Sequence, residues 1–215
     1  MRGDLIVCEH AQGTPEWLAD RAGRATGSRA KDILAKIKTG EAAARRNYRV
    51  QLATERLTGK PQESGFVSKE MQWGTDQEPF ARMAYESATG NLVTEMGFIY
   101  LPNIMAGCSV DGLIEEGDRT GVFEAKCPLS ATHVEYLVSG KLPTEYKPQI
   151  LHNVYVTGAD FADFVSFDPR MPEKLQLFKV RWERDEAEIK EYEAELLDFL
   201  SGVDRVHKSL SELAA

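Results

Sequence analysis

The sequence predicts an α/β fold in which helices flank a mixed central β-sheet. Apolar residues recur at helical spacing before residue 90 and after residue 184, whereas short apolar runs bounded by Gly, Pro or Asn lie between. Helices followed by consecutive strands, a helical stretch and further strands favour a mixed sheet covered by helices. No Pro/Gly/Ser-rich linker divides the 215 residues, so residues 1–215 are expected to form a single domain.

Three helices are expected before the first strand. Ser28 is a candidate N-cap for a helix over residues 28–38, since a serine side chain accepts hydrogen bonds from the free N–H groups of a first turn. A second helix fits residues 41–58, where apolar side chains recur every four positions and Gly59 follows as a stop signal. A third helix fits residues 76–88.

The strands are expected to begin at residue 92. Apolar runs at residues 92–101, 107–114 and 121–127, with a polar turn at 115–120, predict an antiparallel meander. Two short helices, two strands and a final helix complete the chain, and they are expected at residues 130–138, 144–156, 162–168, 175–182 and from 184 to beyond 200.

Composition restricts the class of protein. Apolar residues make up 42% and charged residues 28%, as in ordinary globular proteins. No run reaches the roughly 20 apolar residues of a membrane span, and the N-terminus lacks a signal-peptide pattern, so we expect a cytoplasmic protein with no membrane partner. Cys8, Cys108 and Cys127 form no CxxC pair, so we expect reduced thiols and no zinc site.

Charge is unevenly distributed along the chain. The formal net charge is −8, yet residues 21–60 contain 11 Lys or Arg and 3 Asp or Glu, whereas residues 181–215 contain 5 basic and 10 acidic residues. Two interpretations are open: ordinary solvated helix faces, or an anion-binding face opposite one that repels anions.

The stretch from Asp111 to Lys126 has the composition of a metal site. In the strand 121–127, Glu124 and Lys126 project from one face. If the turn has an even number of residues, Asp111 lies opposite Glu124, with Cβ atoms about 5 Å apart. Two shielded carboxylates that close repel each other unless a cation or a proton joins them, and Mg²⁺ prefers such oxygen ligands. A surface ion pair is the alternative.

Asp111 followed by Glu-Ala-Lys resembles the PD-(D/E)xK nuclease core, although Val110 stands where the family has proline. The wider pattern resembles the phage lambda-type exonucleases, or YqaJ-like viral recombinases. The matching motifs are WLADRAGRATGS (17–28), WGTDQEPFA (73–81), CSVDGL (108–113), FEAKCP (123–128), YKPQILHNVYVTG (146–158) and FDPRM (167–171). This resemblance implies a restriction-endonuclease-like core.

The resemblance also implies roles for individual residues. The implied catalytic set is Asp111, Glu124, Lys126, Glu78 and Gln149. The implied ligands of Mg²⁺, for which Mn²⁺ could substitute, are Asp111, Glu124 and the Ala125 carbonyl, with Lys126 orienting the attacking water. A pocket for a terminal 5′ phosphate is implied at Arg21, Ser28 and Ser109.

By resemblance, the expected activity is degradation of one strand of duplex DNA from its 5′ end, which leaves a 3′ tail for single-strand annealing. Family members form ring-shaped homotrimers, bind double-stranded DNA ends and work with an annealing protein, so the same partners are expected here. The alternatives are an end-independent endonuclease or junction resolvase, and a non-catalytic module that binds DNA ends. A small-molecule phosphohydrolase is disfavoured because no Gly-rich phosphate loop is present.

Several of these residues also have purely structural interpretations. Thr75 and Glu78 have the T-x-x-E spacing of a capping box, which explains Glu78 without catalysis. Ser28 fits an N-cap as well as a phosphate ligand. Gln149 and His152 share a helical face, a spacing typical of ordinary core or surface pairs.

Overall fold

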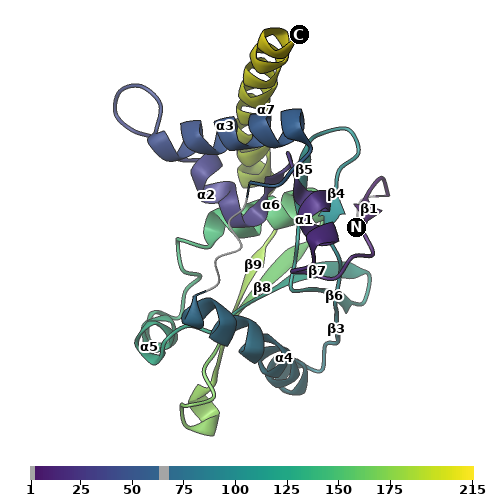
Figure 1. The fold of residues 1–215 in the computed structure, drawn as a ribbon. Helices are drawn as coiled ribbons and strands as arrows, with labels where there is room; N and C mark the ends of the chain where they lie inside the picture. Colours follow the sequence, from purple (N-terminus) through teal and green to yellow (C-terminus); the bar gives the residue numbers. More distant parts are fainter. Residues whose placement is uncertain (1–2, 63–67) are drawn as a thin grey trace.

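A computed structural model describes residues 3–62 and 68–215 (Figure 1). Its strands form two sheets, one of order β3-β6-β7-β8-β9 and one of order β1-β4-β5-β2. The strands are β1 (Ile6–Val7), β2 (Ala25–Thr26), β3 (Val93–Thr94), β4 (Ile99–Tyr100), β5 (Ala106–Cys108), β6 (Gly112–Glu116), β7 (Arg119–Lys126), β8 (Phe161–Phe167) and β9 (Leu177–Glu183). The α-helices are α1 (Pro15–Arg21), α2 (Ala30–Ile33), α3 (Ala43–Thr58), α4 (Lys69–Thr89), α5 (Ser130–Ser139), α6 (Lys147–Thr157) and α7 (Glu186–Ala214).

The larger sheet is mixed, as predicted. Strands β6 and β7 are antiparallel, β7 and β8 are parallel, and β8 and β9 are again antiparallel. The parallel pair requires a long crossover, which α5 and α6 provide. On one face, Val122 packs in a core shared with α3, α6 and α7, and on the other face Phe123 and Ala125 pack against α4.

The β6–β7 hairpin has the predicted register. Leu113 pairs with Val122 and Gly112 with Phe123. The strands extend further than expected, so the turn contains only Gly117 and Asp118, and Gly117 has φ +62°. Two-residue hairpin turns favour a positive φ that glycine adopts without strain. The even number of turn residues preserves the register.

The predicted antiparallel pairing is confirmed, since β3 pairs with β6 and β6 with β7, but the first two predicted strands are not continuous, because the chain changes sheets twice. The expected strand 92–101 divides into β3 and β4, which belong to different sheets, and the expected strand 107–114 divides into β5 and β6. Between β3 and β4, Gly97 lies against the N-terminal segment so closely that a Cβ there would be 2.0 Å from the Cys8 carbonyl oxygen. This packing draws the chain out of the larger sheet.

Two predicted helix starts are also wrong. Ser28 lies inside a 3₁₀ turn, Gly27–Arg29, so it is not the N-cap of a helix over residues 28–38. Helix α4 begins seven residues earlier than expected, where the Ser68 side chain accepts a hydrogen bond from the Met71 N–H. Thr75 therefore lies within the helix, and the capping-box explanation of Glu78 is excluded.

Helix α1 was not predicted from the sequence. It begins after Thr14, whose side chain accepts a hydrogen bond from the Trp17 N–H, and Pro15 occupies the first helical position. A threonine cap followed by proline is a recognised start signal, so the residues 14–17 carried enough information to find it.

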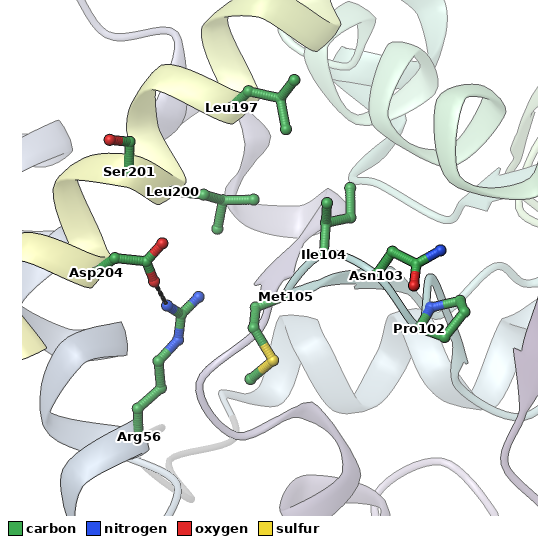
Figure 2. A pocket seen from close by; sticks show the side chains of 9 residues that line it. All are labelled: Arg56, Pro102, Asn103, Ile104, Met105, Leu197, Leu200, Ser201 and Asp204. Carbon is green, nitrogen blue, oxygen red and sulfur yellow. Dashed lines mark hydrogen bonds and ion pairs between the residues drawn. The ribbon is translucent and has the colours of Figure 1, made fainter.

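The basic and acidic segments pack against each other, so a basic face opposite an acidic face is a wrong interpretation. Helix α3 crosses α7 (Figure 1), and Arg45 pairs with Asp198 at 2.8 Å. Arg56 pairs with Asp204 in the same way, beside a cavity of about 280 Å³ between α3, the β4–β5 loop and α7 (Figure 2). Much of the positive charge of residues 21–60 is neutralised within the fold.

All three cysteines are free thiols, as predicted, and Cys108 and Cys127 are buried. In the described part of the chain, no helix combines the length and the apolar content that crossing a bilayer requires.

Candidate active site

Glu124 lies in the middle of the larger sheet, and its side chain has no exposed surface. It projects toward α6. Oε1 accepts hydrogen bonds from Lys126 Nζ and Gln149 Nε2, and Oε2 accepts one from Asn153 Nδ2 at 3.0 Å. A fully buried carboxylate with three donors is not a surface ion pair, so that alternative interpretation of Glu124 and Lys126 is excluded.

Asp111 is hydrogen-bonded to the same short stretch of β7. It immediately precedes β6, and its Oδ2 accepts a hydrogen bond from the Ala125 N–H at 2.8 Å. The β6–β7 ladder ends at the Gly112–Phe123 pair. Beyond it, the Asp111 carboxylate accepts a hydrogen bond from β7 in place of a backbone carbonyl of β6. The hairpin brings Asp111, Glu124 and Lys126 together, as its register predicts.

The electrostatics of this cluster are those of crowded carboxylates. Burial raises the pKa of Glu124 to about 7, with Lys126 opposing the shift and Asp111 adding to it. Burial and the neighbouring Asp111 likewise raise the pKa of Glu78 to about 7. Burial by itself lowers the pKa of Lys126, but Glu124 and Asp111 raise it well above its usual value. One ammonium group therefore lies among three carboxyl groups, and two of them, Glu124 and Glu78, resist ionisation.

Glu78 reaches the cluster from the opposite layer. It lies on α4, and the Arg170 side chain contacts both α4 and the residues that follow β7. The Arg170 side chain hydrogen-bonds the Asp168 carboxylate at 2.7 Å and the Pro128 carbonyl at 3.0 Å, and its guanidinium lies 4.9 Å from the Trp73 ring centroid. This contact connects α4 to the end of β7.

A divalent cation fits this donor set. Among the described residues, no group of three or more His, Cys, Asp or Glu side chains is arranged to hold a metal ion by itself. Mg²⁺ does not need one, since one or two carboxylates with waters and substrate phosphates complete its octahedron. Buried carboxylates with raised pKa values, such as Glu124 beside Asp111, gain most from a cation because it removes their mutual repulsion.

Arg21 and Ser109 lie together, and Ser109 is two residues before Asp111. Ser109 Oγ accepts hydrogen bonds from Arg21 Nη1 at 3.2 Å and from Trp17 Nε1 at 3.1 Å. The guanidinium of Arg21 stacks 4.1 Å from the Trp17 ring centroid. Helix α1 thus supplies an arginine of fixed orientation next to the β5–β6 connection.

Ser28 lies in the 3₁₀ turn that follows β2. It lines a cavity of about 170 Å³ between the 3₁₀ turn and α6, together with Gln149, Lys31 and Tyr146. Gln149 connects this cavity to the cluster because its side chain also donates to Glu124. Thr26 pairs with Gly107 in the parallel β2–β5 ladder, and Ser28 and Ser109 each follow that pair by two residues. Ser28 is thus connected both to the strand that leads to Ser109 and, through Gln149, to the carboxylates.

His152 is a core residue. Its ring is buried, with Nδ1 2.6 Å from Tyr192 Oη and Nε2 2.8 Å from the Gly107 carbonyl oxygen. Burial lowers its pKa to about 4. Asn153, the next residue, was missed by the sequence analysis although it contacts Glu124, because a buried asparagine on a helix has no pattern of its own.

Comparison with known proteins identifies the family. Residues 16–160 match the YqaJ-like viral recombinase domain, a range that contains every implied site residue. The chain belongs to the YqaJ-like viral recombinase family. The comparison with curated proteins found no match.

Solved structures share the fold of this YqaJ-like domain. LHK-Exo in complex with dAMP is 42% identical, with a TM-score of 0.83 over 94% of this chain and 98% of that one. A structure described as an alkaline exonuclease (LHK-Exo) from Laribacter hongkongensis is 40% identical, with a TM-score of 0.82 and the same coverage. A phage-related exonuclease from Haemophilus somnus 129PT is 14% identical with a TM-score of 0.64, over 89% of this chain and 96% of that one, which is a similarity of fold alone.

Proposed function

We propose that this protein is a metal-dependent exonuclease that degrades one strand of duplex DNA from its 5′ end and leaves a 3′ single-stranded tail for recombination by annealing. The observation that supports this best is the buried Glu124 carboxylate, bonded to Lys126 on its own strand and adjacent to Asp111. The 42% identity to LHK-Exo over most of both chains supports exonuclease activity. The 5′ direction and the annealing pathway rest on analogy with the family.

In this proposal, Asp111, Glu124 and the Ala125 carbonyl hold Mg²⁺, with Mn²⁺ as a substitute. The bound ion would polarise the scissile phosphate and lower the pKa of a water. Glu124 is suited to this role because it is buried, and burial strengthens its attraction for a cation, while Asp111 beside it is partly exposed and so remains accessible to substrate.

Lys126 would act as a hydrogen-bond donor and not as a base. Its raised pKa keeps it protonated at neutral pH, so it cannot accept a proton from water. Its ammonium can orient the attacking water and stabilise the negative charge that develops on the phosphate. Glu78 is the better proton acceptor, because a pKa of about 7 matches neutral pH.

The terminal 5′ phosphate would bind at Arg21, Ser28 and Ser109. The Arg21 guanidinium is oriented by Trp17 and Ser109, and a guanidinium can bind a phosphate through two parallel hydrogen bonds. Arg21→Ala should therefore reduce the preference for phosphorylated over hydroxyl 5′ ends. An unchanged preference would remove Arg21 from this role.

We also propose a ring-shaped homotrimer that encloses the duplex, and a single-strand annealing protein as its partner. Both follow from family analogy. Light scattering at working concentration should give three times the chain mass of 24.0 kDa. A monomer under those conditions would contradict the ring.

The activity can be tested on linear duplex DNA with each strand labelled separately. With Mg²⁺, the strand with the 5′-phosphorylated end should shorten while its complement survives, and EDTA should stop the reaction. Glu124→Gln keeps the shape of the side chain but removes its charge, so it should be inactive. A covalently closed circle should remain intact; its cleavage would indicate an endonuclease, and DNA binding without nucleotide release would indicate a non-catalytic module.

A further inference from the structure

We propose that Asn153 is a positioning residue that fixes the orientation of the Glu124 carboxylate for cation binding; the inference rests on the proposed function. Glu124 presents its two oxygens to different partners. Oε1 accepts from Lys126 and Gln149, whereas among the described residues Oε2 accepts only from Asn153. The second oxygen is therefore held by one amide.

The orientation of this amide is determined by its neighbour. An ionised carboxylate only accepts hydrogen bonds, so the NH₂ group of Asn153 must face Glu124, and its oxygen must face the other way. Asn153 is 1% exposed, and its Oδ1 is buried without a hydrogen-bond partner among the residues that the structure describes. A buried acceptor without a partner destabilises the fold, which indicates that the amide is present for its contact with Glu124.

The oxygen side of the amide is packed against the 3₁₀ turn. A Cβ added at Gly27 would lie 2.2 Å from Asn153 Oδ1. Gly27 does not have a positive φ, so its lack of a side chain matters here for space and not for backbone conformation. The Asn153 amide is thus confined between β7 and the turn that carries Ser28, and it cannot rotate away from Glu124 without moving that turn.

This arrangement has a consequence for cation binding. Hydrogen bonds from Lys126 and Gln149 to one oxygen leave the carboxylate free to pivot about that oxygen, and the bond from Asn153 removes this freedom. Partners that hold a ligating carboxylate typically contribute about 10- to 100-fold to metal affinity.

The test measures Mn²⁺ binding by calorimetry in the absence of DNA, alongside thermal unfolding of each variant. Asn153→Leu has a similar volume and lacks the donor, so its Mn²⁺ affinity should fall at least tenfold. Its unfolding temperature should change little, because the substitution also removes the unpartnered oxygen. The matched control is Thr157→Val, one turn further along α6: Thr157 is equally buried and donates to the Asn153 backbone carbonyl at 2.7 Å. Thr157→Val should bind Mn²⁺ as the wild type does.

Gly27→Ala provides a second, independent variant if Asn153→Leu does not fold. The added methyl group must displace the amide from Glu124, so the same loss of Mn²⁺ affinity is expected. Wild-type affinity in a folded Asn153→Leu or Gly27→Ala protein would overturn the positioning role and leave the proposed nuclease function intact. Failure of the wild-type protein itself to bind Mn²⁺ would overturn the proposed metal site and the role of Asn153 together.

Discussion

At the scale of single residues, the site is defined by one ammonium group among carboxyl groups that burial keeps from ionising freely. Glu124 and Glu78 both have a pKa raised to about 7, and Lys126 is the basic group bonded directly to Glu124. A protonated lysine beside a cation has a clear chemical use, since both attract the phosphate oxygens of a nucleic acid.

Replacement of Lys126 by alanine should reduce the cleavage rate by about 10³-fold, because the donor that stabilises the developing phosphate charge is lost. Duplex binding should remain measurable, since the proposed phosphate ligands Arg21, Ser28 and Ser109 are unchanged. The measurement is single-turnover cleavage with a binding assay on the same DNA. Lys179→Ala, an exposed lysine on β9, is the control and should cleave normally. Turnover of Lys126→Ala at the wild-type rate would remove Lys126 from catalysis.

The affinity for Mn²⁺ should rise as the pH increases from about 6 to about 8. A cation binds the ionised carboxylates, and protons compete with it below the pKa of about 7. Without the cation, the folded protein should lose stability between pH 4.5, the ordinary pKa of a glutamate, and about pH 7, the raised pKa of Glu124. In this range the folded state still holds a proton that the unfolded state has released. Calorimetry in two buffers should detect proton release near pH 7, and a pH-independent affinity would contradict the assignment.

At the scale of secondary-structure elements, the hairpin was predictable because its turn is short and its pattern is local. Gly112 and Phe123 pair as the alternation of side chains requires. The exchange of strands between two sheets was not predictable, because it depends on contacts between distant segments, such as Gly97 with Cys8. The start of α4 was missed for a related reason: the capping signal at Ser68 precedes a stretch with weak helical periodicity.

Elements also determine which basic residues are available to DNA. Lys36 forms an ion pair with Glu195 of α7, whereas Lys31, at the start of α2, is exposed beside Ser28 and has no ion pair with any described residue. A count of charged residues in the sequence does not distinguish these two lysines. The fold leaves Lys31 free to contact a phosphate near the site.

Lys31→Ala should therefore weaken duplex binding and lower the slope of log affinity against log salt by about one, the effect of losing one phosphate contact. Lys36→Ala is the matched control, because its charge is already paired with Glu195, and its slope should equal that of the wild type. Equal slopes for both variants would show that Lys31 does not touch the DNA backbone.

At the scale of the whole molecule, the basic and acidic segments neutralise each other in part. The acidic residues of α7 pair with arginines of α3, as in the Arg45–Asp198 and Arg56–Asp204 pairs, so neither the excess of basic residues in 21–60 nor the excess of acidic residues in 181–215 is fully exposed as net charge. The sheet then carries Glu124 on the face beneath α6, while α4 brings Glu78 from the other side. Both layers are needed to assemble one site.

The central claim is that Asp111 and Glu124 together bind one divalent cation. The most direct measurement is the anomalous difference map of a crystal soaked in Mn²⁺. The predicted result is a single peak about 2.2 Å from a carboxylate oxygen of each of these two residues, next to Lys126. A map with no peak at that position, or with a peak that touches neither carboxylate, would contradict the account.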